Sequence, residues 1–237
     1  GNATPVECTG DIRTLVDWEN YATASTETAR FCYLFNGCTA LTTAPELPAT
    51  TLAAYCYEGM FYNCDALTIA PELPADTLAE HCYECMFYNC AYLTTAPELP
   101  ATKLAKYCYN SMFINCHALT TTPVLPATTL AEYCYNYMFN NCTNLTTSPV
   151  LPATTLAEYC YYYMFYNCRK LSSITMLATD ISATMCLYRW VYGVSSSGTF
   201  YKNSKANWTT TGINGIPTGW KVEPYVPTEA GTEGAAE

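Results

Sequence analysis

The chain has 237 residues, of which 50% are hydrophobic and 13% are charged, so it can form a sizeable core. Ten basic and twenty acidic residues give a net charge of −10, which disfavours nucleic acid and anionic membranes as partners because both would repel the chain. No apolar run approaches the roughly 20 residues of a membrane-spanning helix. The first ten residues lack the basic and apolar regions of a signal peptide.

Residues 1–40 are predicted to form an N-terminal cap and a degenerate repeat. The segment 31–40, FCYLFNGCTA, is a degenerate copy of the units that follow it, and Trp18 lies before it. A stack of repeats exposes apolar surface at both ends, so its terminal units must differ from the others and cover that surface.

Residues 41–170 contain five repeats of 26 residues. A leucine opens each repeat and recurs once more after the last one, at Leu41, Leu67, Leu93, Leu119, Leu145 and Leu171. Such regular periodicity indicates stacked coils, in which each repeat buries its apolar face against its neighbours.

Each repeat is expected to contain one short strand followed by one short helix. Leu67 begins an extended segment that Pro71 and Pro74 end, because proline cannot donate to a strand ladder. Thr77 followed by Glu80 fits a capping box at the start of a helix.

Comparison of the repeats with one another favours the helix. The unvarying positions of the segment 56–64 are Cys56, Tyr57, Met60, Phe61, Asn63 and Cys64. At 100° per residue, all of them except Asn63 cover one arc, whereas the varying positions 58, 59 and 62 cover the opposite arc. An unvarying inner face and a variable outer face are typical of a helix packed on a core.

Residues 171–223 are predicted to form a degenerate repeat and a C-terminal cap. Three of the four tryptophans lie there, at Trp190, Trp208 and Trp220. Residues 198–220 fit short strands joined by glycine-rich turns. Residues 224–237 have no apolar period and are expected to form a disordered tail.

The motifs resemble those of a known family. Cys-x-x-Leu, proline, leucine and Phe-x-Asn-Cys follow one another as in the BspA-type leucine-rich repeats of bacterial surface proteins, most closely at residues 61–67. The resemblance covers roughly residues 30–200, although this repeat is longer and carries an added Pro-x-Leu-Pro. The sequence of the repeat is also similar to that of repeat proteins of Bacteroides and their phages. The resemblance implies an α/β leucine-rich-repeat solenoid, secreted or on the cell surface, with a role in adhesion or recognition.

Twelve of the fifteen cysteines form two rows with the period of the repeat, at positions equivalent to Cys56 and Cys64. Within one repeat the two rows are eight residues apart, about 12 Å along a helix, which is beyond the reach of a disulfide. We therefore expect free, buried thiols, with cross-linking as the alternative.

Two metal sites are weaker alternatives. One is a zinc site at the C-x-x-C motif of residues 82–85, but zinc sites of this kind need two such pairs. The other is a calcium site at Glu46, Glu72 and Glu98, which share one position in three successive repeats and would otherwise splay into water. We expect no metal and no cofactor.

The variable positions of the predicted helix form the predicted binding surface. Tyrosine and asparagine are common there, as they are in antibody paratopes, and exposed aromatic clusters mark interaction sites. The predicted binding residues are Tyr137, Tyr162, Tyr163, Tyr166, Asn110, Asn136 and Asn140. Neutral variation at exposed sites is the alternative reading.

The sequence thus predicts a surface-exposed or secreted module that binds a protein or a glycan through its repeats. The alternative is a structural spacer in a larger surface protein. No catalytic residues are expected, because His81 and His117 occupy different positions of their repeats and no nucleophile or carboxylate arrangement recurs around them.

Overall fold

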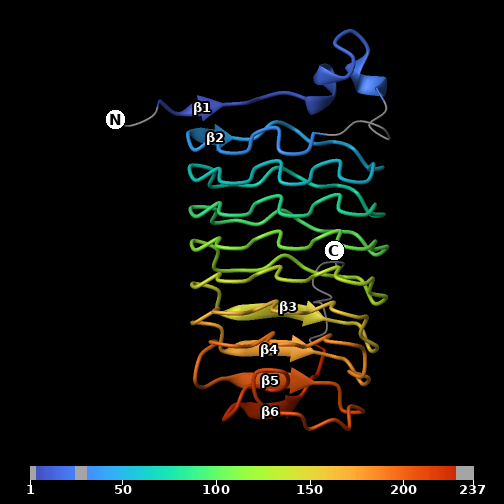
Figure 1. Cartoon of the computed structure of the whole chain (residues 1–237), viewed down its shortest axis with the longest axis vertical. Helices are drawn as coiled ribbons and strands as arrows, with labels where there is room; N and C mark the ends of the chain where they lie inside the picture. Colours follow the sequence, from blue (N-terminus) through green and yellow to red (C-terminus); the bar gives the residue numbers. More distant parts are fainter. Residues whose placement is uncertain (1–3, 25–30, 228–237) are drawn as a thin grey trace, which may run out of the picture.

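The structure, a computed structural model, describes residues 4–24 and 31–227. It is a solenoid whose flat coils lie one on another from the N-terminal to the C-terminal end (Figure 1). Its regular elements are β1 (Val6–Glu7), η1 (Ile12–Leu15), η2 (Tyr21–Thr23), β2 (Leu41–Thr43), β3 (Thr147–Leu151), β4 (Ser173–Met176), β5 (Thr199–Lys202) and β6 (Lys221–Pro224). Within the described residues, none is an α-helix, and none is a helix long and apolar enough to cross a membrane.

The strands of successive coils pair in parallel along one face of the solenoid. Strands β3 to β6 form a four-stranded sheet in chain order, and β1 pairs with β2 at the other end (Figure 1). The register within the sheet follows the repeat, so that Ile174 lies opposite Phe200. Equivalent residues of neighbouring coils therefore stack on one another and share the same burial.

Proline decides where this sheet is continuous. In β3, Pro149 has no N–H to donate, and the pairing with β4 shifts register between Thr147 and Val150. In β4 the equivalent position is Thr175, and the pairing of β4 with β5 is regular. Between β2 and β3, where every repeat has its prolines, pairing is reduced to isolated bridges such as Ile69–Thr95. The predicted short strand is therefore a full strand chiefly in the C-terminal coils.

The predicted helix in each repeat is wrong. In the segment 55–64, the N–H groups of the even-numbered residues donate to the carbonyl three residues earlier, at 3.0–3.3 Å. Those of the odd-numbered residues 57–63 donate to carbonyls of the next coil, 25 residues ahead, at 2.8–3.0 Å. The segment is thus a run of turns whose donors are all paired, half of them within the coil and half between coils.

A left-handed residue at every fourth position shapes these turns. In this coil the residues are Tyr55, Gly59 and Asn63, with φ of 63°, 55° and 59°. Positive φ ends an α-helix, yet a four-residue turn brings positions 56, 60 and 64 to one side just as a helix does. The shared spacing is why the unvarying arc looked helical. Thr77 likewise is no helix cap, because it bridges to Thr51 and Lys103 of the neighbouring coils.

The core consists of side-chain rows that run along the solenoid axis. The rings of Tyr57 and its equivalents stack at 5.8–6.1 Å, and those of Phe61 and its equivalents at 5.6–5.8 Å. All fifteen cysteines are free, and eleven of them are buried. Thiols equivalent to Cys90, which donates to the Phe61 carbonyl at 3.1 Å, bond to the preceding coil. Cys38 differs from its row because it is exposed.

The two ends of the solenoid are covered in different ways. At the C-terminal end, Trp190 is fully buried and its indole N–H donates to the Gly215 carbonyl at 2.9 Å. At the N-terminal end, Ile12 and Phe31 are buried, and Phe31 stacks on Tyr57. Trp18 does not cover the core, because it is 78% exposed.

The predicted disordered tail starts within an ordered element. Pro224 is the last residue of β6, and the N–H of Tyr225 donates to the Lys202 carbonyl at 2.8 Å. Residues 228–237 of the predicted tail lie outside the described residues.

Candidate binding surface

The first feature is a row of rings, one from each of five coils, at the position where the turns of each coil begin. Its members, which we call the aromatic row, are Tyr55, His81, Tyr107, Tyr133 and Tyr159. Neighbouring rings are nearly parallel, with centroids 4.4–4.6 Å apart. Each is the left-handed residue that opens the turns of its coil. Because stacked rings cover one another's faces, the row presents ring edges and polar tips to solvent.

The second feature is a cluster of seven tyrosines at the C-terminal end of the aromatic row. We call this group the tyrosine cluster, and its members are Tyr137, Tyr159, Tyr162, Tyr163, Tyr166, Tyr188 and Tyr192. Tyr137 stacks on Tyr163 at 4.9 Å, and Tyr166 stacks on Tyr192 at the same distance. Tyr162 contacts Tyr188 in the next coil at 5.2 Å. The cluster therefore joins three successive coils.

Three of the predicted binding residues are asparagines, and two of them are buried. Asn110 and Asn136 are only 9% and 7% exposed, so the prediction that they lie on the outer surface is wrong. The equivalent residues in the flanking coils are Glu84 and Tyr162, whose side chains are longer. The Asn110 side-chain amide donates to Glu84 at 2.5 Å. Asn140 is half-buried.

The four predicted tyrosines lie together. Tyr137, Tyr162, Tyr163 and Tyr166 are all half-buried, and each ring contacts another of the four. Burial and the neighbouring phenols of Tyr162 and Tyr163 raise the pKa of Tyr137 to about 12. The Tyr137 phenol therefore stays neutral at physiological pH, and the surface offers hydroxyl groups and apolar ring edges.

The sequence reasoning missed the aromatic row, Tyr188 and Tyr192. These residues occupy three positions of the repeat: the one before the first cysteine row, the one that Tyr162 occupies and the one that Tyr166 occupies. An aromatic residue before that cysteine in five successive repeats was the signal for a stack, but it is visible only when repeats are compared across coils.

The two histidines lie in different places. His81 is a member of the aromatic row, and its Nδ1 contacts a carboxylate oxygen of Glu84. His117 lines a shallow groove of about 450 Å³ beside Asn89 and Asn115. In the part of the chain that the structure describes, no three histidine, cysteine, aspartate or glutamate side chains come together as a metal site.

The strand side of the solenoid differs in chemistry from the turn side. One of its grooves, of about 460 Å³, lies between two coils and is walled by Pro45, Pro48, Pro71 and Pro74. Glu46 and Glu72 border it and are exposed. Exposed threonines such as Thr94 and Thr120 continue this side toward the C-terminal end.

Comparison with known proteins gives one finding. The family described as BspA type Leucine rich repeat region matches residues 31–146 and 57–185, in six copies. No curated protein and no solved structure matches the chain.

Proposed function

Because the chain belongs to the BspA-type leucine-rich repeat family, we propose that it is a surface-exposed or secreted module that binds a protein partner through the tyrosine cluster. Leucine-rich repeats commonly mediate protein interactions, and a stack of coils displays one extended surface for them. An origin of the chain in Bacteroides or its phages is an expectation that rests on the sequence of the repeats.

The observation that carries this proposal is the continuity of the tyrosine cluster. Seven tyrosines touch one another across three coils, and Tyr192 is 43% exposed at the rim. Tyrosine is enriched among the residues that dominate interface energy, because it buries a large rigid surface and still offers a hydroxyl group. Neutral variation would not require the rings of neighbouring coils to contact one another.

Ring orientation favours a protein over a glycan. A sugar usually stacks on an open aromatic face, but in the aromatic row both faces of each inner ring are covered at 4.4–4.6 Å. Ring edges and hydroxyl groups remain, and these suit apolar and polar side chains of a protein. A glycan array therefore serves as the contrasting arm of the test.

The test starts from protein and glycan arrays probed with the chain, and it compares two variants with the same partner. The first variant uses residues that the chain itself has at equivalent positions: Tyr137→Ser and Tyr163→Ser follow Ser111, Tyr162→Asn follows Asn136, and Tyr166→Asn follows Asn140. We expect at least about a tenfold loss of affinity with little change in melting temperature, because a few anchors dominate most interfaces.

The matched variant changes the strand side, with Thr94→Lys, Thr120→Lys and Thr146→Lys, all at exposed residues. We expect it to bind as the unchanged chain does. If the threonine variant loses the partner and the tyrosine variant keeps it, the binding face is the strand side. Capture of glycans alone would contradict a protein partner, and capture of nothing on either array would favour the spacer.

A further inference from the structure

One coil already holds a cation against the aromatic row. The ammonium of Lys106 lies 5.3 Å from the centroid of the Tyr107 ring and 5.6 Å from that of Tyr133. It also forms a 2.9 Å ion pair with Glu132 of the next coil. Both ring distances are within the roughly 6 Å at which a cation is attracted to an aromatic ring. Two stacked tyrosines and one carboxylate thus make a cation site, which here is filled from within the chain.

The same constellation recurs one coil further on, but without its cation. Tyr133 and Tyr159 stack at 4.4 Å. Glu158 is the equivalent, one coil further on, of Glu132, the residue that pairs with Lys106. The position equivalent to Lys106 is Glu132, another carboxylate. Glu158 is exposed, and among the described residues its carboxylate accepts a hydrogen bond only from the Thr184 hydroxyl, at 3.3 Å. No lysine or arginine in the described part of the chain forms an ion pair with it.

Charge favours a cation at this place. The residues that precede the last four members of the aromatic row are Glu80, Lys106, Glu132 and Glu158, three carboxylates for one ammonium. The whole chain has a net charge of −10. The site is also continuous with the tyrosine cluster, because Tyr159 contacts Tyr162 at 5.7 Å. A partner seated on the cluster would therefore reach it.

We propose that the protein partner inserts a lysine or arginine side chain beside Tyr133 and Tyr159, against Glu158, and so repeats one coil further on the contact that Lys106 makes. This inference rests on the proposed function, since it names the chemistry of the partner at that surface. A cation there is attracted by a carboxylate that forms no ion pair with any described lysine or arginine, and it lies beside two tyrosine rings as Lys106 does.

The test uses a labelled peptide with lysines spaced by glycine, and the same peptide with glutamine in place of lysine. Binding is followed by fluorescence anisotropy at low and at physiological salt. Glu158→Gln should weaken the lysine peptide about fivefold or more, because the cation loses its charged partner. Glu98→Gln makes the same charge change and should leave affinity within about twofold, since that exposed carboxylate occupies the strand-side position of Glu46 and Glu72.

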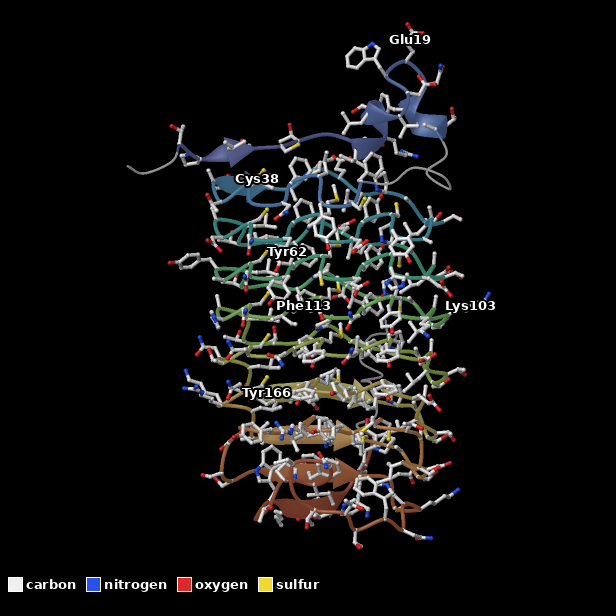
Figure 2. All side chains as sticks on the ribbon, in the orientation of Figure 1. Glu19, Cys38, Tyr62, Lys103, Phe113 and Tyr166 are labelled. Carbon is white, nitrogen blue, oxygen red and sulfur yellow. The ribbon has the colours of Figure 1, made fainter. Side chains whose placement is uncertain are left out.

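A second pair of variants lies within one coil. Lys106→Gln removes the resident cation and opens a second site, so it should tighten the lysine peptide about threefold or more. Lys103→Gln makes the same charge change three residues away. Because Lys103 lies at the edge of the stack and points away from it (Figure 2), this variant should have little effect. Both lysines are outside the core, so both variants should melt as the unchanged chain does.

The outcomes separate clearly. Equal effects of the two lysine variants, or of the two glutamate variants, would show that the peptide responds only to the net charge of the chain. Either result would overturn the proposed site. Failure of the lysine peptide to bind the unchanged chain and Lys106→Gln would also overturn it. Neither result touches the tyrosine cluster, whose role is tested separately by loss of the array partner in the four-tyrosine variant.

Discussion

Asn89 donates its side-chain amide to the side-chain carbonyl of Asn63, one coil away, at 2.8 Å. The same bond joins Asn115 to Asn89 at 2.5 Å and Asn141 to Asn115 at 2.7 Å. All four residues have φ of 58–61°. One residue type thus meets two demands at this position, because asparagine tolerates the left-handed backbone and its amide can both donate and accept along the stack.

Replacing Asn115 separates these two demands. Asn115→Ala should lower the free energy of unfolding by about 1–3 kcal/mol, because alanine is strained at positive φ and the bonds to both neighbours are lost. Asn115→Gly loses the bonds but not the backbone tolerance, and should therefore cost less. Gly37 and Gly193 occupy the equivalent position in other coils. Denaturant unfolding of both variants measures the difference, and equal losses would show that backbone strain plays no part.

Much of the fold could be predicted from the period of the sequence. The 26-residue spacing indicated stacked coils, and the unvarying Cys56, Tyr57 and Phe61 are buried in the core. The helix was mistaken because the spacing of inward residues is the same in a helix and in a four-residue turn. The distinguishing signal was position 63, which holds asparagine in five repeats and glycine at 37 and 193.

The candidate site could be predicted only in part. Tyr137, Tyr162 and Tyr163 follow from variable positions within a repeat. The aromatic row and the burial of Asn110 and Asn136 depend on what the neighbouring coils place beside each residue. A helical projection of one repeat contains no such information, because the long side chains of Glu84 and Tyr162 come from other coils.

Thiol chemistry should reveal the two cysteine rows as unreactive. At pH 8, Cys32 and Cys38 should react first because they are exposed, and Cys8 and Cys85 more slowly. Burial raises the pKa of Cys56 to about 11, which leaves little of the reactive thiolate. The eleven buried thiols should react only after unfolding. Titration with a thiol reagent counts them, and a denatured, unreduced protein with almost no free thiol would show that the rows are cross-linked.

The C-terminal cap should be needed for solubility. Deletion from Gly198 onward removes β5, β6 and the Gly215 carbonyl that pairs with Trp190, and so exposes the apolar end of the stack. The shortened chain should aggregate or bind a hydrophobic dye. Deletion of residues 228–237 alone is the control and should leave the association state by light scattering as it is in the unchanged chain. A soluble chain with unchanged melting after the longer deletion would show that these strands cover nothing essential.

Alkaline pH should weaken the tyrosine cluster in a defined window. The pKa of Tyr137 is raised to about 12, whereas an unfolded tyrosine ionises near pH 10. The contribution of Tyr137 to stability is therefore fully present below pH 10 and is lost as the pH rises toward 12, because the unfolded chain releases its proton first. Tyr137→Phe retains the ring but not the titration. Between pH 10 and 12, the free energy of unfolding should fall more steeply with pH for the unchanged chain than for the variant. An equal fall in both would contradict the raised pKa of Tyr137.

The central claim of the proposed function is that a protein partner covers the tyrosine cluster. Hydroxyl-radical footprinting of the complex with an array-selected partner tests this directly, because it reads the solvent access of individual side chains. We expect oxidation of Tyr162, Tyr166 and Tyr192 to fall when the partner binds, while Ile69 and Val124, 65% and 68% exposed on the strand side, remain unchanged. Protection of Ile69 and Val124 with no change at the tyrosines would contradict the account.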